Sequence, residues 1–146
     1  INLNSVIIYT SKLNYYKGLF FFTAVYDMIF GIVFTFFPKW PYELMGISQK
    51  LPEYLAYLSL IGAFLFVIGV AYFLIYRGDL QKNIDLILVG VLYKLAYFSI
   101  TFFYFAIDDI PHILFFVVFG VFDFVMFILM TECYISIRKQ SRGLSK

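Results

Sequence analysis

Three charged residues stand inside apolar runs that are long enough to cross a membrane. Lys94 lies in GVLYKLAYFS, Asp27 in AVYDMIFGIV and Asp123 in FGVFDFVMFI, each near the midpoint of its run. A central Asp or Lys opposes insertion by about 2.5–3.5 kcal/mol, so three that faced lipid would oppose it by roughly 7–10 kcal/mol. We therefore expect the three side chains to face inward and meet, with Lys94 touching Asp123 or Asp27.

This cluster has a structural and a chemical interpretation. In the first, a Lys–Asp ion pair, with the second carboxyl hydrogen-bonded, fixes which helices adjoin and in what register. In the second, two carboxylates and one ammonium sum to −1, which an apolar interior disfavours, so one carboxyl should hold a proton. Such a site, formed by Asp27, Lys94, Asp123 and Tyr97, would bind a cationic or hydrogen-bonding ligand or pass a proton. A third alternative is contact with a partner subunit or a lipid headgroup.

The amino-acid composition indicates what class of protein contains these three charged residues. Of 146 residues, 63% are hydrophobic and 14% are charged, against roughly 45–50% and 25% in soluble domains. This indicates an integral membrane protein. With about 20 apolar residues needed per crossing, the chain has room for four spans and little else. No soluble catalytic domain fits, so we expect no enzyme, although a membrane enzyme with an aspartate as acid or base is a further hypothesis.

The chain divides into four predicted spans with polar ends. The spans are predicted at residues 18–37, 55–76, 84–107 and 113–133, with an interfacial segment at 1–17 and a basic polar tail at 134–146. Pro38 ends the first span because it cannot continue a helix. Residues 38–54, with Trp40, should form an ordered interfacial loop. The chain begins at Ile1 without a methionine, and residues 1–16 lack the pattern of a signal peptide, so we expect its true start to be missing or processed.

The basic residues outside the spans predict the orientation. Eight lie on one side, Lys12, Lys17, Arg77, Lys82, Arg138, Lys139, Arg142 and Lys146, against two on the other, Lys39 and Lys50. Because cytoplasmic loops carry an excess of Lys and Arg, we expect an antiparallel all-α bundle of four helices with both termini on the cytoplasmic or matrix side. That location corresponds to a bacterial or mitochondrial inner membrane.

Small residues predict close helix packing in the second span. Ser59, Gly62, Phe66, Gly69 and Phe73 recur at three- and four-residue spacing along one face. Small residues on such a stripe let a neighbouring backbone approach. We therefore expect Gly62 and Gly69 to face another helix.

Metal and cofactor signals are weak. The single cysteine, Cys133, excludes an internal disulfide or a CxxC pair. His112 lies near Asp108 and Asp109, but a solvated turn whose carboxylates cap helices is a better interpretation than a metal site. The aromatic residues would suit a quinone, haem or pigment cavity, yet no second histidine exists for bis-His haem ligation. We expect no metal and no cofactor, and the formal charge of +2 gives no reason to expect nucleic-acid binding.

The order of features resembles the DoxX-like group of small four-helix membrane proteins. The resemblance rests on a charged first span ending in FFPKW, a glycine-bearing second, a basic third and an acidic fourth span, over residues 17 to 133. The group includes subunits of membrane oxidoreductases that work near quinones. The resemblance therefore implies an accessory subunit, and it transfers no site residue because no short motif of the group is matched.

Two functions follow as hypotheses. The first is a non-catalytic accessory subunit, or a hydrophobic-ligand-binding protein, of a membrane assembly such as a respiratory one. Its expected partners are other membrane subunits or a second copy of the chain, together with a bound lipid or quinone. The alternative is a proton-coupled transporter or an oligomeric channel that uses Asp27, Lys94 and Asp123.

Overall fold

The computed structural model describes residues 3–143, with side chains described for residues 11–141. The main helices are α1 (Leu3–Phe36), α3 (Leu55–Arg77), α4 (Ile84–Ala106) and α6 (Asp123–Gly143). Shorter helical segments are α2 (Trp40–Leu44), η1 (Ser48–Lys50), α5 (Ile113–Phe115) and the π-helix η2 (Phe116–Phe122). No strand occurs within residues 3–143.

Four helical stretches are long and apolar enough to cross a membrane. They are Ser11–Phe36, Leu55–Arg77, Ile84–Ala106 and Ile113–Ser141, and the last runs through α5, η2 and α6 without interruption. These helices lie close to the four predicted spans, and their length and composition indicate an integral membrane protein. The helices continue past the predicted outer boundaries: α1 is unbroken through residues 3–17, and α6 continues to Gly143. Residues 1–2 and 144–146 lie outside the described part of the chain.

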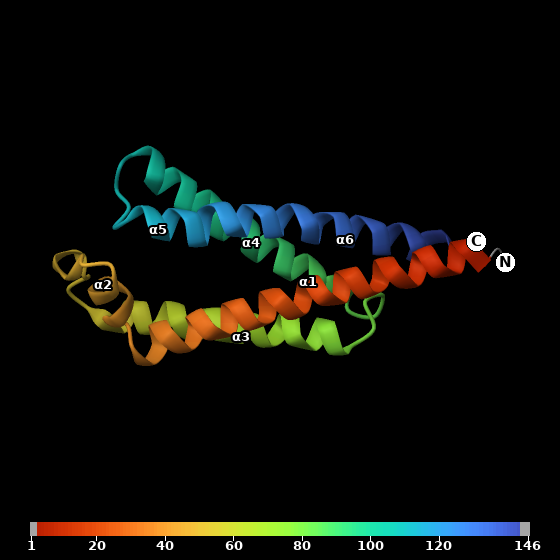
Figure 1. Ribbon diagram of the computed structural model, residues 1–146, viewed down its shortest axis with the longest axis horizontal. Coiled ribbons are helices and arrows are strands. Elements are labelled where there is room, and N and C mark those ends of the chain that lie inside the picture. Colours follow the sequence, from red (N-terminus) through yellow and green to blue (C-terminus); the bar gives the residue numbers. More distant parts are fainter. Residues whose placement is uncertain (1–2, 144–146) are drawn as a thin grey trace.

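The helices form two closely packed pairs. Helix α1 packs along α3, and α4 packs along η2 and α6, whereas contacts between the pairs are fewer. In Figure 1 the beginning of α1 and the end of α6 lie at one end of the molecule, here called the terminal end, and α2 and α5 lie at the other, the α2 end. In Figure 1 the two pairs lie farther apart at the α2 end than at the terminal end.

Glycines set the close approach of α1 and α3, as the sequence predicted. A Cβ atom on Gly62 would lie 2.5 Å from the backbone nitrogen of Thr35, and one on Gly69 would lie 2.8 Å from that of Met28. The contact is mutual, because a Cβ on Gly31 of α1 would lie 2.6 Å from the backbone nitrogen of Phe66. These backbones can pack this closely only where no side chain stands between them.

Two clusters of buried residues fill the interior. The larger contains Phe20, Tyr72, Ile87, Met130 and Cys133 and extends towards the terminal end. The smaller, Phe34, Tyr42 and Ile47, joins α1 to the segment that carries α2. Many large apolar side chains are instead exposed on the outer surface; Phe36, for example, is 71% exposed. An outer surface of this kind suits a hydrocarbon solvent.

Backbone geometry at the end of α4 corrects the predicted caps. Asp108 has a φ of 57°, and the amide of Asp109 donates to the carbonyl of Tyr104 at 2.9 Å. This is the hydrogen-bond pattern that ends a helix through a left-handed residue, so Asp108 terminates α4. The prediction that Asp108 or Asp109 caps the next helix was wrong: His112 Nδ1 does so, accepting from the amide of Leu114.

Candidate functional site

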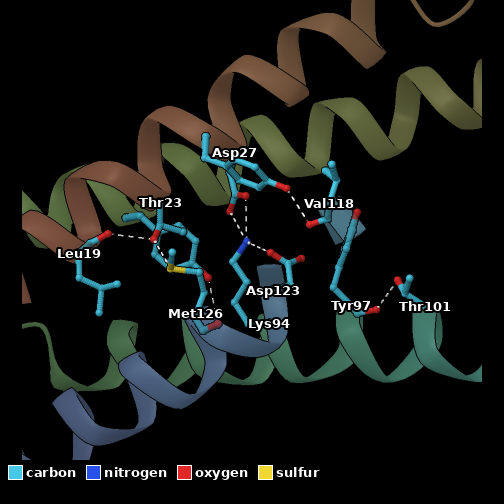
Figure 2. A network of polar contacts seen from close by, with 12 residues as sticks. Leu19, Thr23, Asp27, Lys94, Tyr97, Thr101, Val118, Asp123 and Met126 are labelled. Atoms are coloured by element: carbon cyan, nitrogen blue, oxygen red, sulfur yellow. Dashed lines mark hydrogen bonds and ion pairs between the residues drawn. The ribbon is translucent and has the colours of Figure 1, made fainter. Parts of the chain in front are cut away.

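Lys94 bridges both buried carboxylates. Its Nζ donates to Asp27 Oδ1 and Oδ2 at 2.9 and 3.0 Å and to Asp123 Oδ1 at 2.8 Å (Figure 2). The three side chains are 0–1% exposed. The prediction of a contact is confirmed, and the ammonium joins α1 and α6 through α4 rather than choosing one partner. We call Asp27, Lys94 and Asp123 the charge cluster.

Three tyrosine rings surround the ammonium. The ring centroids of Tyr26, Tyr72 and Tyr93 lie 5.6, 5.8 and 5.7 Å from Lys94 Nζ. A ring face within about 6 Å attracts a cation, by about 2 kcal/mol or more where water is excluded. These rings therefore supply part of the stabilisation that water would give an exposed ammonium.

No sequence pattern predicted this arrangement of Tyr26, Tyr72 and Tyr93, which we call the tyrosine cage. Tyr26 and Tyr93 adjoin Asp27 and Lys94 in the chain, but neighbouring positions on a helix point about 100° apart, so adjacency does not predict contact. Tyr72 comes from α3, which carries no charge in its apolar run. It reaches α4 by donating its hydroxyl to the carbonyl of Gly90 at 2.9 Å.

A π-helix positions Asp123. Segment η2 ends at Phe122, so Asp123 is the first residue after it. The wider turns of a π-helix rotate the residues that follow relative to a regular α-helix, and such segments are frequent at functional sites. The hydroxyl of Tyr26 donates to the carbonyl of Val118 inside η2 at 2.8 Å, which ties the π-helix to α1.

Tyr97, the fourth predicted site residue, lies beside the charge cluster and makes no hydrogen bond to it. Its backbone carbonyl accepts from Thr101 Oγ1 at 2.8 Å, and its ring centroid lies 4.7 Å from that of Tyr93. Figure 2 shows the Tyr97 side chain extending away from the backbone of α4. Tyr97 lines a cavity that the sequence did not predict.

This cavity has a volume of about 440 Å³ and lies between the two helix pairs. Its size and mostly apolar lining are those of small-molecule sites, which usually measure about 300–1,000 Å³ and contain few polar groups. It is lined by Phe34, Tyr42, Leu58, Ile61, Leu65, Tyr97, Ile100, Thr101, Tyr104, Asp109, Ile110, Pro111, Phe115 and Phe119.

The deep end of the cavity approaches the charge cluster. Tyr97 lies three residues after Lys94, Phe119 lies four before Asp123, and Phe34 lies seven after Asp27. Since one turn advances about 5.4 Å, each lining residue is only one or two turns from the charge on its own helix.

The outer end of the cavity lies at the loops of the α2 end. Asp109, Ile110 and Pro111 line it there, and Lys50 Nζ donates to the carbonyl of Pro111 at 2.9 Å, which joins the two loops. Tyr42 is buried, and burial raises the pKa of its hydroxyl. The phenol of Tyr42 is therefore a neutral part of the wall.

On the terminal side of the charge cluster the interior is packed. Thr23 Oγ1 donates to the carbonyl of Leu19 at 2.9 Å and lies 3.4 Å from Met126 Sδ. Beyond these residues is the larger buried cluster with Phe20 and Met130, both 0% exposed. The cavity thus approaches the charge cluster from the α2 end, while apolar side chains fill the other side.

Comparison of this chain with protein-family models, with curated proteins and with solved structures finds no match.

Proposed function

We propose that this chain is a non-catalytic integral membrane protein that binds a hydrophobic or amphipathic small molecule of the bilayer in the cavity between its helix pairs. The observation that carries the proposal is the cavity itself: about 440 Å³, apolar, and lined by both pairs. Cavities of this size and lining are the usual sites for small ligands. A lipid or a quinone is a ligand of the expected kind.

The charge cluster has a structural role in this proposal. Lys94 on α4 contacts carboxylates on α1 and α6, and the three-way contact holds the two pairs together at the floor of the cavity. Because a wrong register would leave a charge unpaired in an apolar interior, the cluster also favours one arrangement of the helices. The cavity then keeps a fixed shape.

Membership of a larger assembly is part of the proposal. The feature order shared with DoxX-like proteins supports an accessory subunit in a bacterial or mitochondrial inner membrane, and many apolar side chains are exposed on the outer surface. The exposed residues serve equally for contact with lipid, with other membrane subunits or with a second copy.

The proposed orientation predicts a labelling result. In an antiparallel bundle with cytoplasmic or matrix termini, exposed Lys39 faces outward and exposed Ser141 faces inward. An impermeant maleimide added outside intact cells or mitoplasts should modify Lys39→Cys and spare Ser141→Cys, and native Cys133 is buried. Modification of Ser141→Cys from outside would contradict the orientation.

A matched pair of variants tests binding. Leu58 lines the cavity and Leu60, two residues away on α3, is 53% exposed and does not. Leu58→Trp should fill the cavity, and Leu60→Trp adds the same bulk outside it. We expect protein purified in mild detergent to carry one small molecule per chain by mass spectrometry, with at least half lost in Leu58→Trp and none in Leu60→Trp. Equal content in all three proteins would contradict the proposal.

The alternative function is proton-coupled transport, and one observation favours it. The cavity approaches the charge cluster from one side only, as in a transporter open to one face of the membrane. A proton flux in liposomes that Asp123→Asn abolishes would favour transport over binding. A large stoichiometric complex in native membranes would favour the accessory subunit, and a homo-oligomer a channel.

A further inference from the structure

A buried hydroxyl group close to the cavity lacks a hydrogen-bond partner. The hydroxyl of Tyr93 is buried, and within the described residues it forms no hydrogen bond. A buried donor left unpaired costs about 1–3 kcal/mol, so such groups are rare and require an explanation. Tyr93 is one of the three tyrosines around Lys94, and its ring lies beside that of Tyr97 with the two planes tilted by 35°.

Tyr97 connects this unpaired hydroxyl to the cavity. The two rings lie one turn apart on the same face of α4, with centroids 4.7 Å apart, and Tyr97 lines the cavity. A phenol both donates and accepts. The Tyr93 hydroxyl can therefore donate to Tyr97 Oη, and in that arrangement the proton of Tyr97 is left free to be donated into the cavity. An accepting atom at the floor of the cavity would extend this short chain by one hydrogen bond.

We infer that the ligand of this cavity is an uncharged, elongated apolar molecule that carries a hydrogen-bond-accepting oxygen, such as a ketone or ester carbonyl, at the end that lies deepest. The inference rests on the proposed binding function and specifies its ligand. The remaining length of the molecule lies among apolar side chains such as Leu58, Leu65 and Phe115 and points towards the α2 end.

The surroundings disfavour a charged leading end. The walls are mainly aliphatic and aromatic, and burial of an isolated ion among such groups is far more costly than burial of a carbonyl that receives a hydrogen bond. Beyond the floor, the charge cluster has two carboxyl groups against one ammonium, which repels an anion. The ammonium is already bonded to both carboxyl groups, so it is not directed into the cavity.

Four probes of equal chain length test this class. We would measure dissociation constants of 2-hexadecanone, hexadecane, palmitate and hexadecylamine for the full-length protein in detergent by native mass spectrometry. We expect 2-hexadecanone to bind most tightly. One neutral hydrogen bond corresponds to about a fivefold change in affinity. Tyr97→Phe should therefore weaken the binding of 2-hexadecanone about fivefold and leave the binding of hexadecane unchanged. Tyr57→Phe, which removes a hydroxyl from an α3 residue that is 66% exposed and does not line the cavity, is the matched control and should change the binding of neither probe.

Tyr93→Phe gives a second measurement that does not depend on a probe. It removes an unpaired buried hydroxyl and keeps the ring beside Lys94. It should therefore raise the thermal unfolding midpoint of the ligand-free protein. It should also weaken the binding of 2-hexadecanone.

The outcomes separate the two proposals. Equal binding of ketone and alkane, unchanged by Tyr97→Phe, would overturn the ligand class and leave the binding function intact. Tightest binding of hexadecylamine or palmitate would overturn the class in favour of a charged ligand. If no probe binds and the purified protein carries no small molecule, the binding function fails and the inference fails with it.

Discussion

Replacement of Lys94 by methionine should lower the free energy of unfolding by about 3–5 kcal/mol, the largest single-residue effect that we expect from a charged residue. The side chain is 0% exposed, and its Nζ is the shared hydrogen-bond donor of Asp27 and Asp123. Its loss leaves two carboxyl groups facing each other in an apolar interior. Thermal unfolding in detergent measures the effect. Lys39→Met, on an exposed residue, should change the stability little.

Combined variants test whether the charge cluster acts as a unit. Since Nζ contacts both carboxylates, Lys94→Met with Asp27→Asn, and Lys94→Met with Asp123→Asn, should each recover part of the loss. The triple variant, which carries all three replacements, should recover more because no charged group is left unpaired. Interacting residues give non-additive changes in stability. Strictly additive losses in both double variants would contradict the cluster.

Gly62→Leu should be the most damaging change in the α1–α3 contact. A Cβ there would lie 2.5 Å from the backbone nitrogen of Thr35, and a backbone atom, unlike a flexible side chain, cannot yield without separating the helices. Forced overpacking costs typically 1–3 kcal/mol, and we expect about 3 kcal/mol here. The loss should appear as a lower unfolding midpoint in detergent.

The adjacent residue supplies the control for Gly62. Ala63 is exposed on the same helix, so Ala63→Leu adds a similar side chain towards the surrounding lipid or detergent. Its stability should stay close to that of the unmodified protein. Equal damage from Ala63→Leu and Gly62→Leu would contradict this account. The loss would then come from the effect of leucine on helix formation or membrane insertion, and not from the close approach of α1 to α3.

The features that could be predicted from the sequence are those for which any other arrangement would cost much free energy. Three charges at mid-span are too costly to face lipid, so the meeting of Asp27, Lys94 and Asp123 followed without a structure. The small residues along one face of the second span predicted a helix contact at Gly62 and Gly69, because small residues at that spacing permit close packing.

Features that depend on exact helix rotation were not predictable. The π-helix η2 changes the direction of every later residue, and no residue type in FVVFGVF indicates it. The tyrosine cage requires Tyr26, Tyr72 and Tyr93 from three helices to converge. The cavity depends on the separation of two helix pairs, which is a property of the packed molecule rather than of any one segment.

Photocrosslinking at Leu65 tests the central claim, that a small molecule occupies the cavity, most directly. Leu65 lines the cavity and is 1% exposed, so bulk lipid does not reach it from outside. A diazirine analogue of leucine at this position, irradiated in native membranes, should give an adduct of one discrete small-molecule mass. The same analogue at exposed Leu60 should give the mixed adducts of bulk lipid. Adducts at Leu65 that are absent, internal to the chain or as mixed as those at Leu60 would contradict a bound ligand in the cavity.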